Sequence, residues 1–182
     1  MNKSDLRPAH EKCSRTTLAT WLRCGAILLI ACSGIAHAQT WSKFQSTADG
    51  FEIDAPGKVE TEAEKPDPKL VRSTEYTVEG DGLLVSVSAT LANVDLNLAG
   101  AVTGSFPNFK CKTKTSDQNL DVSGGQAREL RGDGCVEQRS IVARYYVVGK
   151  WLYQVFALYS SEKKADAARF IDSFKLLNPG AK

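Results

Sequence analysis

The most informative stretch of the sequence is "ARYYVVGKWLYQVFALY", residues 143–159, which has the pattern of two strands joined by a tight turn. The pair Gly149-Lys150 suits a two-residue hairpin turn with glycine in the first position. That turn would place Tyr146 opposite Tyr153, with the other residues paired outward from it. Both faces of the resulting hairpin are largely apolar, whereas a hairpin with one wet face alternates apolar and polar residues. The pattern therefore predicts a central hairpin in a sheet that is covered on both sides.

Further strands are predicted on the N-terminal side of this hairpin. Residues 51–57, "FEIDAPG", alternate apolar and acidic side chains before a Pro-Gly stop. The runs "LVRSTEYTVE" and "LLVSVSATL" flank the turn at residues 80–82, which indicates a second hairpin.

Two helices are predicted to cover the sheet. In residues 95–106 apolar side chains recur near helical spacing, with Asp95 as a candidate N-cap. Near the C-terminus, Ser160-Ser161-Glu162 precedes a helix with an apolar stripe formed by Ala167, Phe170, Ile171 and Phe174. We therefore predict an α+β fold, a three-layer α/β/α sandwich with a central, mainly antiparallel sheet.

The N-terminus has the features of a secretory leader. A polar, basic segment precedes an apolar run at residues 24–35, which is too short for a membrane span of about 20 residues. Residues 36–38 form an Ala-x-Ala cleavage site, and residues 29–32 resemble a lipobox that would leave a lipid anchor on Cys32. We favour cleavage after Ala38, with residues 1–38 as signal peptide and residues 39–182 as one periplasmic or secreted domain. A membrane-anchored lipoprotein is the alternative.

Removal of this leader leaves few groups for catalysis. Both histidines, His10 and His37, precede the favoured site, so no imidazole remains to activate a nucleophile or to bind zinc. Five of the 23 Lys and Arg residues and two of the 21 Asp and Glu residues also lie there, which leaves a net charge of −1. Nucleic-acid binding would need a clustered basic surface instead. We expect a protein that is not an enzyme and has no metal or cofactor. A hydrolase with paired carboxylates is a weaker alternative, because no motif sets their separation.

Two cysteines remain after the leader, and their spacing predicts a disulfide. "FKCKTKTSDQNLDVSGGQARELRGDGC" has the form of two strands meeting at residues 123–125. Cys111 and Cys135 each lie twelve residues from Ser123, so a hairpin would bring them opposite each other. In a secreted chain such a pair is most simply a structural disulfide. The alternative, a redox pair, usually has Cys-x-x-Cys spacing at a helix start.

Three lysines alternate along the same predicted strand. Lys110, Lys112 and Lys114 would share one face, where they could dock an acidic partner or an anionic envelope surface. The alternative is a solvated edge strand whose charges prevent aggregation.

The central hairpin also carries an aromatic set formed by Tyr145, Tyr146, Trp151, Tyr153 and Phe156. We expect these rings to pack in the core, since paired aromatic residues on buried strands are ordinary core content. The alternative is the lining of a ligand pocket.

Several segments resemble bacterial secreted domains with the PsbP-like fold. They are "WSKFQSTADGFEIDAPG", "RYYVVGKWLYQVFAL" and "ARFIDSFKLL". The fold is shared by the photosystem protein PsbP, an envelope lipoprotein and a Ran-binding protein, and the resemblance implies an antiparallel sheet between helical layers. Such relatives bind or stabilise partner proteins, and the matching positions are packing and turn residues. We therefore expect a non-catalytic protein that binds or stabilises an envelope protein. A small-ligand domain with a pocket between sheet and helix is the alternative.

Overall fold

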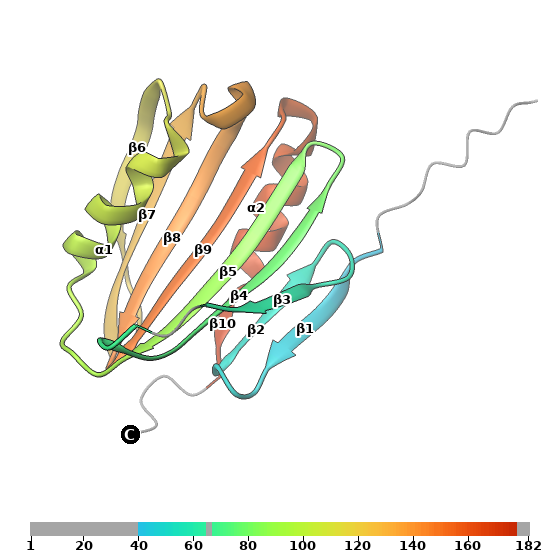
Figure 1. Ribbon diagram of the computed structural model, residues 1–182. Coiled ribbons are helices and arrows are strands. Elements are labelled where there is room, and N and C mark those ends of the chain that lie inside the picture. The colour runs from blue at the N-terminus through green and yellow to red at the C-terminus, as the bar shows by residue number, and fades with distance from the viewer. Residues whose placement is uncertain (1–39, 65–66, 178–182) are drawn as a thin grey trace, which may run out of the picture. The chain divides into compact units, whose positions relative to one another are not determined.

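The computed structural model describes residues 40–64 and 67–177 (Figure 1). The predicted leader, with both of its cleavage sites, lies outside these residues. In the described part of the chain, two antiparallel sheets are accompanied by two α-helices. The larger sheet has the strand order β3-β4-β5-β9-β8-β7-β6, and the smaller one β1-β2-β10.

The larger sheet consists of β3 (Glu60–Ala63), β4 (Leu70–Gly80), β5 (Leu83–Ala92), β6 (Thr113–Leu120), β7 (Gly125–Asp133), β8 (Ser140–Val148) and β9 (Trp151–Tyr159). The smaller sheet consists of β1 (Ser42–Ser46), β2 (Phe51–Ala55) and β10 (Lys175–Leu176). The helices are α1 (Leu98–Ser105) and α2 (Lys164–Ser173), with short 3-10 turns η1 (Phe106–Phe109), η2 (Val136–Gln138) and η3 (Ser161–Lys163).

The predicted central hairpin is β8–β9. Its register pairs Val148 with Trp151 and Tyr146 with Tyr153, as the turn at Gly149 requires. Gly149 has φ 58°, a left-handed value that favours glycine. β9 pairs on its other side with β5, and β8 with β7, so neither strand of the hairpin is at an edge. The hairpin at residues 80–82 is also confirmed, as β4–β5.

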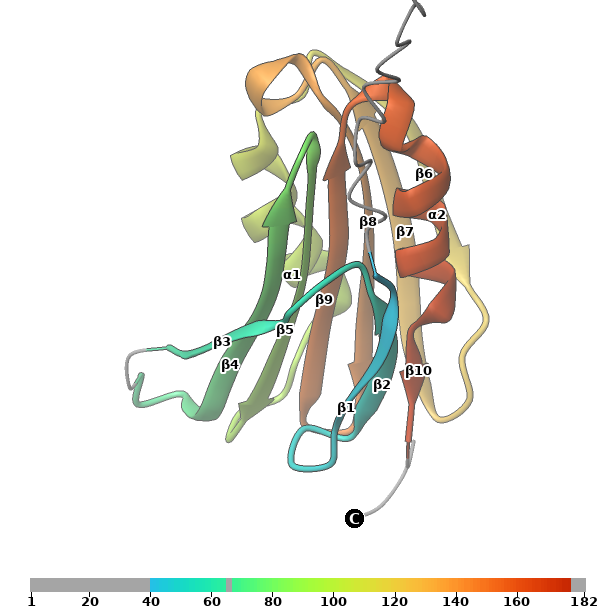
Figure 2. The same cartoon turned by 90° about the vertical axis from the view of Figure 1, so that its right-hand side faces the viewer.

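One face of the large sheet is covered by α2 together with the small sheet (Figure 2). Phe51 of β2 is fully buried, and its ring lies 5.7 Å from that of Phe174, which follows α2. Phe170 and Ile171 of α2 are buried in the same cluster. Each such side chain contributes about 1.5–3 kcal/mol by leaving water. The small sheet is therefore held to the large one by a shared core with α2.

The opposite face is only partly covered, by α1 and η1. Leu98 and Val102 of α1 pack on Leu130 of β7 and on Ile141 and Tyr145 of β8. α1 is only eight residues long, and it contacts β8 and β7 but is not in extended contact with β4 and β5. The two latter strands place the small polar side chains of Ser73, Ser86, Ser88 and Thr90 on this face, together with the carboxylate of Glu75.

The helix starts differ from their predictions. α1 is capped by Asn97, whose Oδ1 accepts a hydrogen bond from the backbone N of Gly100 at 3.1 Å. The predicted cap Asp95 instead accepts a hydrogen bond from Nζ of Lys150 at 2.7 Å. α2 begins after Lys163 without a side-chain cap, because the predicted capping residues lie in and before η3.

The α+β class and the mainly antiparallel sheets are confirmed. The three-layer sandwich with helical outer layers is not confirmed. The helix α2 shares its face of the large sheet with the small sheet of β1, β2 and β10. Within the described residues, no helix is long and apolar enough to cross a membrane.

Candidate functional site: a groove beside α1

A groove lies on the partly covered face of the large sheet. Its hollow has a volume of about 200 Å³. In Figure 1, strands β8, β9 and β5 are visible between α1 and β3, and Figure 2 shows α1 and β3 on the side of the sheet opposite α2. The groove is lined by Glu64, Glu75, Ser88, Ser105, Asn108, Phe109, Ala143, Arg144, Tyr145, Gln154, Val155 and Phe156.

The helical wall of the groove is fixed by aromatic packing and one hydrogen bond. η1 continues α1 through Pro107, which brings the ring of Phe109 to 5.0 Å from that of Phe156 on β9. At the end of α1, Oγ of Ser105 donates to the hydroxyl of Tyr145 at 2.9 Å. Burial raises the pKa of Tyr145, so its hydroxyl stays protonated at neutral pH. The wall is thus a fixed, largely apolar surface.

The opposite rim is acidic. β3 pairs with β4 so that Glu62 lies directly opposite Glu75, and Glu60 lies opposite Thr77 on the same face. Oε1 of Glu75 accepts a hydrogen bond from Oγ of Ser86 at 2.9 Å, while the backbone N of Glu64 continues the pairing by donating to the carbonyl of Ser73.

None of the carboxylates of Glu60, Glu62, Glu64 and Glu75 has a basic group within 4 Å in the described part of the chain, although ion pairs are common elsewhere on the domain. Among the described residues that line the groove, Arg144 is the one basic residue, and its guanidinium is bound on the opposite face. The groove therefore presents negative charge beside apolar rings.

A buried ion-pair network on the α2 side holds that guanidinium. Glu129 is 1% exposed and accepts from Nε of Arg131 at 2.8 Å and from Nε of Arg144 at 2.7 Å. Arg144 also binds Asp172 and the carbonyl of Ile171. Burial would raise the pKa of Glu129, but the two arginines outweigh it and lower the pKa below its usual value. This network joins β7 and β8 to the end of α2.

A second polar cluster fixes the β1–β2 turn. Asp49, which is 1% exposed, accepts a hydrogen bond from the hydroxyl of Tyr76 and pairs with Arg72. The hydroxyl of Tyr153 donates to the carbonyl of Asp49 at 2.9 Å. Burial first, and then the charge of Asp49, raise the pKa of Tyr153 to about 12. Arg72 also lies over the ring of Trp151, 5.4 Å from its centroid. The cluster joins the small sheet to β4 and β9.

The predicted aromatic set is divided between the two faces. Tyr146, Trp151 and Tyr153 belong to the core under α2 and the small sheet, as core packing predicts. Tyr145 and Phe156 point to the other face and line the groove. Three of the five aromatic residues therefore pack in the core under α2, and the other two line the groove.

The predicted disulfide between Cys111 and Cys135 is present. β6 and β7 form the predicted hairpin, and a bulge between Lys114 and Ser116 shifts the register by one residue. On the N-terminal side of the bulge, Thr113 lies opposite Asp133. Cys111 precedes Thr113 by two residues and Cys135 follows Asp133 by two, so the same register places the cysteines opposite each other. Without that shift the two side chains would point to different faces.

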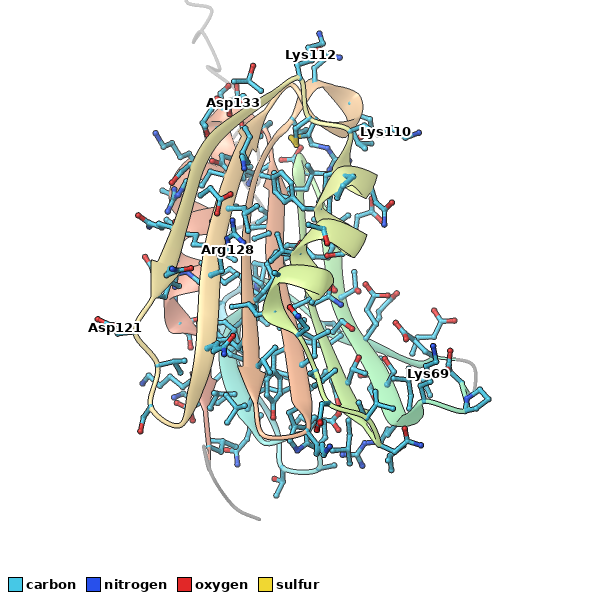
Figure 3. All side chains as sticks on the ribbon, turned by 90° about the vertical axis from the view of Figure 1, so that its left-hand side faces the viewer. Lys69, Lys110, Lys112, Asp121, Arg128 and Asp133 are labelled. Atoms are coloured by element: carbon cyan, nitrogen blue, oxygen red, sulfur yellow. A yellow bond between two sulfur atoms is a disulfide. The ribbon has the colours of Figure 1, made fainter. Side chains whose placement is uncertain are left out.

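The three lysines do not form the predicted strand face. β6 begins only at Thr113, because Lys110 takes a left-handed conformation (φ 51°) after η1. Lys110 and Lys112 lie at one end of the sheet (Figure 3), where Nζ of Lys112 donates to Oε1 of Gln138 at 2.7 Å. Nζ of Lys114 pairs with Asp117 at 2.6 Å. The alternating spacing implied a longer strand than the chain forms.

Neither the acidic rim nor the two buried polar clusters was predicted from the sequence. A signal for the groove was present in β5, which places Ser86, Ser88 and Thr90 at alternate positions, whereas β8 and β9 have no such row of small polar residues. Within residues 40–64 and 67–177, no group of three or more His, Cys, Asp or Glu residues is arranged to hold a metal ion.

Among known proteins, 13 chains of solved structures match this chain. The chain matches no protein-family model and no curated protein sequence. It is similar to the solution structure of cyanobacterial PsbP (CyanoP) from Synechocystis sp. PCC 6803, with 18% identity and a TM-score of 0.49. The similarity covers 81% of this chain and 98% of that chain.

Proposed function

We propose that residues 39–182 form a non-catalytic periplasmic or secreted domain that binds a protein partner in the cell envelope through the groove beside α1. The observation that carries this proposal is the combination of an open, side-chain-sized hollow with carboxylates that have no basic partner among the described residues. Surfaces that combine an apolar centre with a charged rim are typical of protein interfaces.

The predicted leader and the disulfide support this compartment, since disulfides persist in oxidising compartments. The absence of histidine after the favoured cleavage site supports a non-catalytic role. Partner binding is also what the resemblance of the sequence to the PsbP-like fold implies. The lysines of the earlier prediction are less suited to this role, because Lys112 and Lys114 bind residues of their own chain.

A small-molecule site is the second candidate, and the size of the groove counts against it. Pockets for small ligands and cofactors usually measure about 300–1,000 Å³. The groove, at about 200 Å³, is smaller and open to solvent, and it has room for one side chain rather than for an enclosed ligand.

Site-specific photocrosslinking in the native envelope tests the proposed function. A photoreactive phenylalanine analogue replaces Asn108, which is exposed on the groove wall, and the matched control replaces Ala165, which is exposed on α2. We expect Asn108 to yield a discrete protein adduct, to be identified by mass spectrometry, and Ala165 to yield none. Absence of any adduct from a panel covering the whole described surface would refute partner binding.

A further inference from the structure

We infer that the groove beside α1 receives an arginine side chain from a basic segment of the partner, with Glu64 and Glu75 binding the guanidinium and Phe109 and Phe156 packing against it. This inference rests on the proposed function and specifies its chemistry. It follows from charge, from the aromatic lining and from an equivalent arrangement elsewhere in the same chain.

The first step concerns charge. Glu62 and Glu75 lie directly opposite each other in an antiparallel pair, where like charges destabilise a sheet. Glu64 continues the row, and none of the three has a basic partner among the described residues. A cation placed in the groove would relieve this repulsion. An acidic partner would increase it, so the rim selects for positive charge.

The second step concerns the aromatic lining. Phe109 and Phe156 form an edge-to-face pair next to Glu75 and Gln154. A guanidinium is planar and weakly hydrated, so it stacks on aromatic rings while binding carboxylates through two hydrogen bonds. An ammonium group is a compact, strongly hydrated charge and gains less from such rings. The lining therefore favours arginine over lysine.

The third step is an internal precedent. On the other side of the sheet, Arg72 lies over the ring of Trp151 and pairs with Asp49. That site combines one carboxylate, one aromatic ring and one guanidinium, all from this chain. Among the described residues, the groove offers the carboxylates and the rings without a guanidinium, since that of Arg144 is engaged with Glu129.

The test uses the protein exported and processed from its full-length gene, labelled with ¹⁵N, and three synthetic peptides. The peptides are acetyl-Gly-Arg-Leu-Arg-Gly-amide and its counterparts with Lys or Glu in place of Arg. We expect the Arg peptide to shift the amide signals of Ser88, Asn108 and Gln154, to bind more tightly than the Lys peptide, and to weaken with added salt. The Glu peptide should not bind.

Paired variants separate groove charge from net charge. Glu64→Gln/Glu75→Gln keeps the acceptor for Ser86 and should weaken binding of the Arg peptide about tenfold, the combined effect of two partly exposed ion pairs. Asp81→Asn/Asp121→Asn makes the same change in net charge at two exposed turns and should leave the affinity within about twofold, because remote surface charges are screened. Glu62→Gln is a further variant that removes the cross-strand repulsion, so it should weaken binding without lowering the melting temperature.

Equal affinity for the Arg and Glu peptides, shifts that map outside the groove, or no binding by any peptide would overturn the inference. An envelope adduct formed at another surface would overturn it too, while leaving the proposed function intact. Conversely, groove binding of the Arg peptide together with no envelope adduct anywhere would support the groove chemistry and refute the partner.

Discussion

Breaking the Cys111–Cys135 disulfide should destabilise the domain mainly through the unfolded chain. The bond closes a loop with a sequence separation of 24. On the chain-entropy model a loop of this length contributes about 3.4 kcal/mol at 25 °C. For a chain the size of residues 39–182 this corresponds to a fall in melting temperature of about 10 °C, at about 3 °C per kcal/mol.

The assay compares oxidised and reduced wild-type protein, since reduction breaks the cross-link without changing a side chain. Urea unfolding gives both the free energy of unfolding and the m-value, which is the slope of that free energy against urea concentration. If the effect acts through the unfolded state, the reduced protein should expose more surface on unfolding and show a larger m-value. Cys111→Ala/Cys135→Ala is the control that cannot reoxidise. It should be less stable than the reduced protein, because Cys135 is buried and its removal leaves a cavity.

The reasoning would be refuted by a difference below about 1 kcal/mol between the oxidised and reduced forms, against an expected range of about 2–4 kcal/mol. A large difference with identical m-values would also count against it, because the bond would then act on the folded state. Peptide binding in the groove should change little, since neither sulfur lines it.

Three further predictions concern other parts of the domain. Gly132→Ala should cost about 1–3 kcal/mol, because the added Cβ would lie 2.8 Å from Sγ of Cys111, and this cost should shrink in the double-alanine variant. Tyr153 has a folded pKa of about 12 against about 10 unfolded, so wild-type stability should fall by about 2 kcal/mol more than that of Tyr153→Phe as the pH rises from 10 to 12, by fluorescence-monitored unfolding. Glu129 has a lowered folded pKa, so its contribution is complete above its unfolded pKa and lost as the pH falls through the folded value. Glu129→Gln should therefore be less stable than wild type at pH 7, by about 1–3 kcal/mol, and should show a smaller loss on acidification in urea titrations.

Local patterns in the sequence were enough to predict much of the sheet. The register of β8–β9 follows from one turn and from alternation on both sides of it, and both are encoded within a few residues. The disulfide was predicted from symmetry around Ser123, but the register next to the turn is one residue off that symmetry, and the bulge between Lys114 and Ser116 restores it. The apolar stripe of α2 was predicted because helical spacing repeats over about two turns, from Ala167 to Phe174.

Features that depend on where an element ends were not predicted. The lysine face required a strand through Lys110, but η1 and a left-handed residue delay β6 to Thr113. The groove depends on the small size of α1 and on which strands it leaves uncovered, which no local pattern encodes. Glu62 and Glu75 become neighbours only through the β3–β4 register, and a long-range pairing of this kind cannot be read from spacing.

The strand order of the large sheet has a consequence for the time course of folding. β6, β7, β8 and β9 follow one another in both sequence and space, so each pairing needs only a short loop. β5 pairs with β9, for example Val87 with Val155, after a long excursion of the chain, and that loop closure costs more entropy. We expect the C-terminal meander to form early and the β4–β5 hairpin to dock on it in the rate-limiting step. Because β4 and β5 supply Glu75 and Ser88 of the groove, the groove would be among the last parts of the molecule to exist, and a partner that binds it would recognise only chains that have finished folding.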